Sequence, residues 1–325
     1  DVTVTEANII AAATTGLVDF VHADGIKDDA VNMVTVGGSE TNAFTAATDG
    51  SATTAGDGAA VITVTTAANL LQAAKIMAAT SGTVEFNGGI TDGVGALITG
   101  AGLSTAFTGV VARDSDVAVN AGSASVDEVN ILVANVNGAI TATVSDTAAN
   151  LSNLLTNGAS PGAIDQISAT VTQGEVTATH LLAIDDATPI TVTATAITKI
   201  TGSGNDVKSV LAATGLNIPT DVEIDVTGII DVATANTIAT GTTGQVDFTG
   251  SINDTAASMA AATTSGAVTA GDETAGFEAA TKFGAVHGDN AVVINVTTAA
   301  NVAQAGTIAA ATTGLVTFAG GITDN

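Results

Sequence analysis

The sequence is short of the residue types that build most binding and catalytic sites. It contains no Cys, Trp or Tyr, only three Pro and three His among 325 residues, and six Lys and Arg in total. Without cysteine the chain has no disulfide framework and no thiolate nucleophile or metal ligand. Six basic residues against 32 acidic ones give a net charge of −26. This charge argues against a nucleic-acid-binding protein, which needs a basic surface, and against docking on anionic lipid.

Several functional motifs are missing as well. No apolar stretch reaches the roughly 18 residues of a membrane span, and no phosphate-binding loop ending in Gly-Lys-Ser/Thr occurs. His22, His180 and His287 are too far apart in sequence to show a metal-ligand spacing. One Gly-x-Ser-x-Gly string occurs at Gly158–Gly162, but Pro161 lacks the N–H that an oxyanion hole takes from the residue after the nucleophile. We therefore predict that the chain is not an enzyme.

What the sequence does contain is repetition. Val61–Asp92 returns as Val293–Asp324 at an offset of 232, with 22 of 32 positions identical and no gap. Shorter copies share the string Gly-x-Val-x-Phe, which ends at Phe20, Phe86, Phe248 and Phe318. Repeats of this size indicate units that stack on their neighbours, because one such unit cannot bury its own apolar face. The absence of Met at Asp1 and the close of a repeat at Asp324 lead us to expect a processed chain or a piece of a longer one.

The pattern of residues within the unit predicts strand, helix, strand and turn. The β-branched run 61–65 favours a strand, and Thr66 is placed to cap the helix that follows. Apolar residues at helical spacing then extend to Ala78, and Gly82 is expected to end the helix in the left-handed conformation. Residues 83–86 alternate as in a half-buried strand, and Gly88-Gly89 forms a turn.

These patterns predict a β-rich repeat protein with short Ala-rich helices, in which strand–helix–strand units stack in a solenoid-like manner. Tandem small β-sandwich domains are the alternative. We expect three regions: 1–92 with an insertion at 31–60, degenerate middle repeats at 93–221, and 222–325 with an insertion at 266–290. Within the middle region the segments 112–119 and 126–133 are expected to be β-like, and a helix is expected over 146–157.

The acidic residues are mainly Asp and lie near Gly, Asn and Thr, as is typical of turns. Turn carboxylates are common calcium ligands, and neighbouring carboxylates repel each other unless a cation lies between them. Four pairs are therefore candidate calcium ligands: Asp28 with Asp29, Asp114 with Asp116, Asp185 with Asp186, and Asp272 with Glu273. Solvated turn acids without a metal are the alternative, and the sequence leaves the choice open.

The string Ser-Asp-Thr-Ala-Ala-Asn-Leu at 145–151, within a chain rich in Ala, Thr, Gly, Val and Asp, resembles repetitive exported bacterial proteins. These are surface-layer proteins and large calcium-dependent adhesins. The resemblance implies a secreted, self-associating structural protein at the cell surface, with copies of itself and cell-surface polysaccharide as partners. The expected function is an extracellular subunit that assembles head-to-tail into a filament, sheath or surface layer. A monomeric stalk or binding module of a large secreted adhesin is the alternative.

Overall fold

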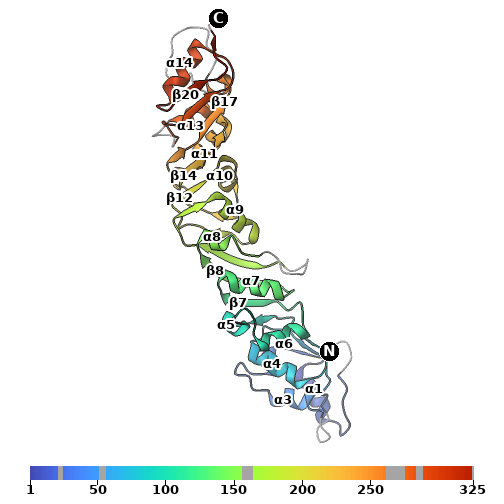
Figure 1. The fold of residues 1–325 in the computed structure, drawn as a ribbon. Helices are drawn as coiled ribbons and strands as arrows, with labels where there is room; N and C mark the ends of the chain where they lie inside the picture. The colour runs from blue at the N-terminus through green and yellow to red at the C-terminus, as the bar shows by residue number, and fades with distance from the viewer. Residues whose placement is uncertain (21–24, 51–55, 156–163, 261–274, 283–287, 324–325) are drawn as a thin grey trace. The chain divides into compact units, whose positions relative to one another are not determined.

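The computed structural model describes residues 1–20, 25–50, 56–155, 164–260, 275–282 and 288–323 (Figure 1). The chain forms two compact units. The first comprises Asp1–Val144, Leu154–Ser168 and Ala187–Ile190, and the second comprises Ser145–Asn153, Ala169–Asp186 and Thr191–Asn325. The fold is mixed α/β with mostly parallel sheets. The prediction of a β-rich protein is corrected to a mixed α/β fold. The described residues form more helix than the β-branched sequence patterns had indicated.

Most of the first unit is built from short strands and helices that alternate along the chain. Its elements are α1 (Val4–Ala12), β1 (Ile26–Asp28), α2 (Ala30–Met33), α3 (Asn42–Thr48), β2 (Ile62–Val64), α4 (Leu70–Ala79), β3 (Val84–Glu85), β4 (Ile90–Thr91), α5 (Val94–Leu97), β5 (Ile98–Thr99), β6 (Gly102–Leu103), α6 (Thr105–Arg113), β7 (Val119–Ser123) and α7 (Val126–Asn135). The strands β8 (Ile140–Asp146) and β9 (Gln166–Val171) contain residues of both units.

The second unit continues the alternation of strands and helices. Its elements are α8 (Ala148–Leu151), β10 (Glu175–Thr177), α9 (Ala178–Ala187), β11 (Val192–Thr193), β12 (Lys199–Ser203), α10 (Gly204–Ala212), β13 (Leu216–Asn217), β14 (Glu223–Thr227), β15 (Ile229–Ile230), α11 (Val232–Gly241), β16 (Val246–Phe248), β17 (Ser251–Asp254), α12 (Ala256–Met259), α13 (Ala275–Thr281), β18 (Val293–Val296), β19 (Ala300–Asn301), α14 (Val302–Ala311), β20 (Val316–Phe318) and β21 (Ile322–Thr323). Figure 1 shows α10 beside β12 and β14 in this unit.

Parallel strands pair at a recurring distance along the sequence. In the second unit, Val176 pairs with Ile200, Ile200 with Ile224, and Ile224 with Val246, so that successive partners follow one another at nearly equal intervals. In another sheet of this unit, Ile230 pairs with Ile252 and Ile294 with Val316 at a similar interval, whereas the step from Ile252 to Ile294 is longer. In the first unit, the step from Ile26 to Ile62 is likewise longer than the step from Ile62 to Val84. The strands therefore share one short spacing in sequence, which is lengthened where extra helices intervene.

The two longer spacings contain matching helices. α2 and α3 lie between β1 and β2, and α12 and α13 lie between β17 and β18. Met33 and Met259 end the first helix of each pair, and Phe44 and Phe277 lie in the second; all four side chains are fully buried. Residues 31–60 had suggested short strands and turns or an exposed insertion, and this interpretation is wrong for α2 and α3, which are helical and have buried side chains.

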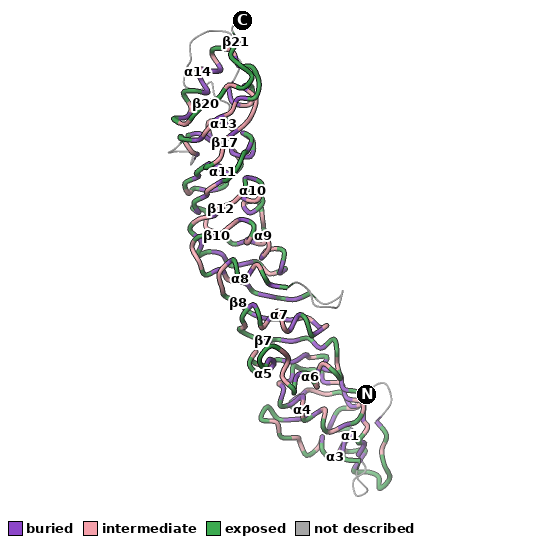
Figure 2. The backbone as a smooth tube through the Cα atoms, viewed as in Figure 1, coloured by how far each residue is buried: buried purple, intermediate pink, exposed green. Residues whose placement is uncertain are grey.

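The apolar core runs along the inner positions of the strands. Buried residues alternate with exposed or half-buried ones along β8 and β14. Figure 2 shows buried and exposed residues mixed along the chain in both units. The inward positions are mainly Val and Ile, and the few large side chains, such as Phe86 and Phe107, are buried. This alternation is the pattern of a strand with one buried face.

Several segments with a strand-like sequence are helical. Residues 2–5 resemble the strand of the main repeat, yet Thr3 caps α1 and forms a capping box with Glu6. The β-like segment 126–133 lies in α7, where Ser125 and Glu128 form the same motif. In the segment 112–119, the first two residues end α6, the last begins β7, and residues 114–118 form a turn and irregular backbone between them. A capping box satisfies two free N–H groups at the helix start and outweighs the strand preference of valine and isoleucine here.

Two details of the main repeat also differ from expectation. The helix cap is Asn69, which forms a capping box with Gln72, rather than Thr66. Gly82 is not in the left-handed region, which Gly89 adopts at φ 74°. Glycine is needed at position 82 because a Cβ there would overlap with the backbone carbonyls of Ala59 and Ala60. The helix expected over 146–157 is confined in the described residues to α8.

Candidate functional site

Aspartates at the ends of short strands join segments that are distant in sequence. One carboxylate oxygen accepts the first backbone N–H of a helix, and the other accepts the N–H of the residue that follows the aspartate. The helix-start bonds run from Val4 N to Asp28 Oδ2 (3.0 Å), from Leu70 N to Asp92 Oδ2 (3.1 Å) and from Val232 N to Asp254 Oδ2 (3.1 Å). The first N–H groups of a helix have no partner within the helix, and its N-terminus favours negative charge. These aspartates therefore hold neighbouring segments together.

A second set of aspartates binds the strands that carry the recurring phenylalanine. The backbone N–H of Phe20 donates to Asp57 Oδ2 at 2.7 Å, that of Phe86 to Asp114 Oδ2 at 2.6 Å, and that of Phe248 to Asp289 Oδ2 at 3.2 Å. In Asp57 and Asp289 the other oxygen accepts from the amide two residues further on, at 2.8 Å in both cases. This bond between the aspartate and the amide two residues further on is an Asx-turn. It orients the carboxylate so that its other oxygen accepts the phenylalanine N–H.

Buried threonines make a third recurring link. The hydroxyl of each donates to a carbonyl of the preceding strand region and accepts the N–H of the second residue after it. The donated bonds are Thr80 to Ala60 O (2.6 Å), Thr188 to Ile167 O (2.6 Å), Thr242 to Val222 O (2.6 Å) and Thr312 to Val292 O (2.8 Å). The accepted bonds come from Gly82, Ile190, Gly244 and Gly314 at 2.9–3.1 Å. All four threonines are buried, so each bond replaces water that the carbonyl would otherwise need.

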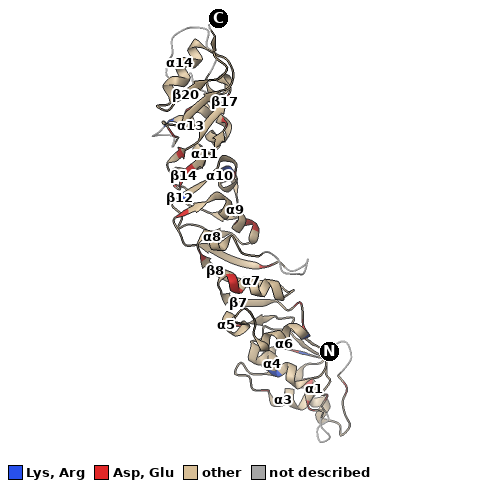
Figure 3. Ribbon diagram, in the orientation of Figure 1, with Lys and Arg blue, Asp and Glu red and all other residues tan. Residues whose placement is uncertain are grey.

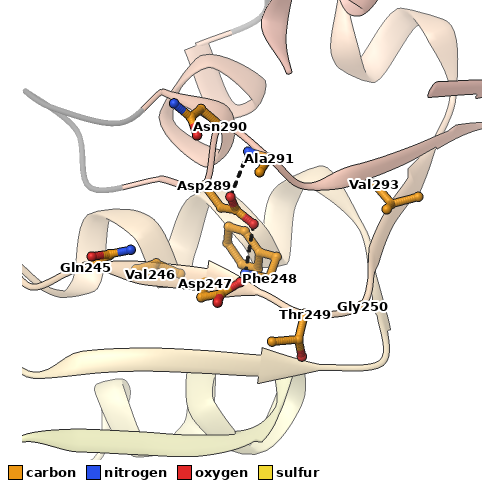
Figure 4. Close-up of a pocket in the computed structure, with 10 residues that line it drawn as sticks. All are labelled: Gln245, Val246, Asp247, Phe248, Thr249, Gly250, Asp289, Asn290, Ala291 and Val293. Atoms are coloured by element: carbon orange, nitrogen blue, oxygen red, sulfur yellow. Dashed lines mark hydrogen bonds between the residues drawn. The ribbon is translucent and has the colours of Figure 1, made fainter. Parts of the chain in front are cut away.

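A cavity of about 580 Å³ opens beside β16 in the second unit (Figure 4). It is lined by residues 245–250, by 289–291 and by Val293. Asp289 lies at its wall with both oxygens bound to backbone amides, those of Phe248 and Ala291. Partial burial, followed by the charges of Asp289 and Asp225, raises the pKa of Asp247. The described residues that line it include no His, Lys or Arg.

Charged residues form a row across the outer face of β12, β14 and β16. Lys199 Nζ lies 3.1 Å from Asp225 Oδ2 and 3.8 Å from Glu223 Oε2. Asp225 is in register with Asp247 on the next strand. The hydrogen bond to Asp225 raises the pKa of Lys199, which therefore stays protonated and is not a nucleophile at neutral pH. Figure 3 shows acidic residues in both units, with few basic residues among them.

The first predicted calcium pair, Asp28 with Asp29, already accepts several hydrogen bonds. Asp28 Oδ1 accepts from the Asp29 N–H at 2.8 Å and from Asn32 Nδ2 at 2.7 Å, and its Oδ2 binds the start of α1. Asp29 Oδ1 accepts the Thr65 hydroxyl at 2.6 Å. These contacts with N–H and O–H donors already use three of the four oxygens, so a metal at this pair would compete with them.

The other pairs are less fully bonded. Asp114 is half-buried, and its burial, together with the nearby Asp116, raises its pKa. Burial and the neighbouring Asp186 likewise raise the pKa of Asp185, whose side chain lies against Gly215. Asp272 and Glu273 lie outside the described residues. In the part of the chain that the structure describes, no three His, Cys, Asp or Glu residues are grouped so as to hold a metal ion. Calcium binding stays a prediction.

The inter-segment links were not identified as a site from the sequence, although signals for them exist. Asp-x-Ala occurs before the strands at Asp57 and Asp289, and Thr-Ser/Thr-Gly precedes the strands at Thr80, Thr242 and Thr312. Both strings recur at equivalent places in the repeats. The partner of each residue is a backbone group, which a sequence pattern does not reveal.

Comparison with known proteins finds no matching family model, no similar curated protein and no similar solved structure. Among the described residues, no helix is long and apolar enough to cross a membrane.

Proposed function

We propose that the chain is an extracellular structural protein that self-assembles head-to-tail into a filament, sheath or surface layer. Its parallel strands are successive turns of a solenoid-like stack, and we call each strand–helix turn from one paired strand to the next a coil. The observation that carries the proposal is that the same three kinds of link, two made by Asp and one by Thr, recur between coils. A structure that repeats one junction along its length can be extended by the same junction.

The chemistry of the links also supports a structural role. In the described residues, the recurring aspartate carboxylates and threonine hydroxyls form hydrogen bonds with backbone groups of the neighbouring coil. Asp92 and Thr242 are examples. A buried polar group that is fully bonded rigidifies a fold and fixes its register. Such groups stabilise a scaffold, and they are not available to bind a substrate.

The net charge of −26 fits an exported protein that meets salt or divalent cations outside the cell. Like-charged copies repel at low ionic strength, and cations screen that repulsion over about 8–10 Å at physiological salt. We therefore expect assembly to be promoted by salt and by calcium, and cell-surface polysaccharide to be a partner through bridging cations.

Negative-stain electron microscopy of the purified chain tests the proposal. It is performed in calcium, after chelation, and after chelation with monovalent salt added to the same ionic strength. The proposal predicts ordered filaments or sheets. Loss on chelation that salt reverses indicates simple screening, and loss that salt does not reverse places calcium at the contacts. Single particles in all three conditions contradict self-assembly and favour the monomeric adhesin module.

A further inference from the structure

Three polar side chains at the cavity beside β16 are not among those that make the recurring links between coils. Gln245, Asp247 and Asn290 are exposed and line the cavity (Figure 4). Among the lining residues, the hydrogen bonds run from the N–H groups of Phe248 and Ala291 to Asp289, and none joins these three side chains to another lining residue. Their polar groups are therefore accessible to a ligand.

The repeats show that the fold does not require these side chains. In the other copies of Gly-x-Val-x-Phe, the position of Gln245 is occupied by smaller or apolar residues, Leu17, Thr83 and Leu315. The position of Asn290, directly after the aspartate that binds the phenylalanine N–H, is occupied elsewhere by small residues, Gly58 and Ser115. The other copies thus keep the frame without an amide side chain at either place. These two amides are candidates for a role other than folding.

The walls of the cavity are fixed by backbone contacts and by buried side chains. β16 is the last strand of the sheet β10-β12-β14-β16, and the segment 289–293 forms the other wall. Asp289 joins the two walls, because it accepts from Phe248 N at 3.2 Å and from Ala291 N at 2.8 Å. Val246 and Phe248 contribute buried apolar side chains to the lining. A preformed cavity of about 580 Å³ is in the size range of small-molecule sites, and little ordering opposes binding there.

The charges at the cavity disfavour an anionic ligand. Asp247 and Asp289 belong to the lining, Asp225 is in register with Asp247, and the described lining residues include no basic side chain. A phosphate or carboxylate group would be repelled there. A bare cation is not favoured either, because it is far smaller than the cavity and both oxygens of Asp289 already accept backbone N–H groups. The cavity therefore suits an uncharged polar molecule.

We propose that this cavity binds one uncharged sugar unit, whose hydroxyl groups form hydrogen bonds with Gln245, Asp247 and Asn290. The two amides both donate and accept hydrogen bonds and the carboxylate accepts them, which matches hydroxyl groups that do both. The C–H faces of a sugar ring can pack on the apolar part of the lining, such as Val293.

The sugar unit can come from a free monosaccharide or from a polysaccharide. In the second case the inference deepens the proposed function and rests on it, because it names the place where the polysaccharide partner binds. The contact is then direct, through hydrogen bonds, and needs no bridging cation.

Binding of uncharged sugars to the full chain tests the inference. Native gel electrophoresis in gels that contain dextran or galactomannan detects binding to a polymer. Saturation-transfer NMR with glucose, galactose and mannose detects binding of the free sugars. Both are performed at low salt with a chelator, where repulsion between copies disfavours self-assembly and no cation can bridge. Retardation of the chain assigns a polysaccharide as the source, and saturation transfer without retardation assigns a free sugar.

Two variants remove the proposed hydrogen bonds and a third narrows the cavity. Asp247→Ala should raise the dissociation constant about tenfold or more, and Asn290→Ala about three- to tenfold, as for the loss of a charged and a neutral hydrogen bond. Ala291→Phe keeps the polar groups and should abolish binding by filling space. All three positions are exposed, so the fold is expected to persist, which far-UV circular dichroism checks. The matched control is Glu85→Ala, at the equivalent of Asp247 in the first unit, which should bind as the unchanged chain does.

If no probe binds the unchanged chain, or if binding appears only when calcium replaces the chelator, a direct sugar site is overturned. If the three cavity variants bind as the control does, the sugar is bound elsewhere and the cavity is the wrong site. Electron microscopy of the same proteins in calcium keeps the two proposals apart. Filaments of a variant that no longer binds sugar leave the proposed assembly standing. A chain that binds sugar but never assembles contradicts the proposed function and leaves the sugar site standing.

Discussion

Replacing Thr242 by valine should destabilise the second unit by about 2 kcal/mol, the sum of two lost hydrogen bonds. The hydroxyl donates to Val222 O at 2.6 Å and accepts from Gly244 N at 2.9 Å, and the side chain is buried. Valine has nearly the same shape, so the substitution leaves no cavity. It removes two hydrogen bonds that contribute about 1 kcal/mol each, and it leaves a carbonyl and an amide without their partner.

Urea unfolding followed by far-UV circular dichroism measures the effect, because the chain has neither Trp nor Tyr as a fluorescent probe. With a denaturant slope of about 2 kcal/mol per molar, the midpoint should fall by about 1 M at an unchanged slope. Because the chain forms two compact units, the transition of the second unit must be fitted separately.

Thr243→Val is the matched control. Thr243 is the next residue, it is exposed, and its hydroxyl donates to Thr220 O at 3.1 Å. Water can replace this bond, so a loss of about 0.5 kcal/mol or less is expected. Equal losses for the two valine variants would refute the reasoning that the buried threonines are principal links between coils.

Three further predictions concern glycine, acid and calcium. Gly244→Ala should destabilise the second unit several times more than Gly93→Ala destabilises the first, as measured by the same urea unfolding. A Cβ at Gly244 would overlap with the Val222 carbonyl, whereas Gly93 has open space around it. Asp114→Asn should raise stability at neutral pH, and this advantage should shrink as pH falls. Burial raises the pKa of Asp114 above 3.8, so protonation at low pH removes the cost of burying its charge. Thermal unfolding at several pH values measures the trend, which would be reversed if the charged form were favoured. Calcium should raise the melting temperature of the unchanged chain by more than it raises that of Asp114→Asn if Asp114 and Asp116 bind it, and an equal rise in both would remove this pair as ligands.

The sign of the acid effect differs between aspartates. The N–H of Thr234 donates to Asp231 at the start of α11 and lowers the pKa of Asp231 below 3.8. Its contribution to stability is therefore present above pH 3.8 and is lost as pH falls through the lowered value. The pKa of Asp114 is raised, so its charged form lowers stability as pH rises. Comparing the two residues therefore distinguishes the effect of hydrogen bonding on an aspartate from the effect of burial.

The repeating part of the fold could be predicted from the sequence, because its signals are local. The β-branched run 61–65 predicted β2, the alternation at 83–86 predicted β3, and the helical spacing after Thr66 predicted α4 to within a few residues. Gly88-Gly89 was expected to form a turn, and Gly89 has the positive φ that such a turn needs.

The remaining elements could not be predicted because their sequences carry signals for two structures, or because their contacts are distant in sequence. Residues 126–133 are rich in valine, isoleucine and leucine, and only the capping pair Ser125 and Glu128 distinguishes the helix from a strand. Gly82 suggested a helix terminator, but its role is a close approach to the carbonyls of Ala59 and Ala60 in the neighbouring coil, which no local pattern contains. The same limit applies to the links, because Asp57 and Asp114 bind the amides of phenylalanines in distant parts of the sequence.

Sedimentation velocity of the unchanged chain over a wide concentration range, in salt and calcium, tests the central claim most directly. The account predicts species that grow continuously with concentration, without stopping at a dimer, because a head-to-tail contact joins two different faces and leaves one of each free in every assembly. A single monomeric boundary at every concentration would contradict the account.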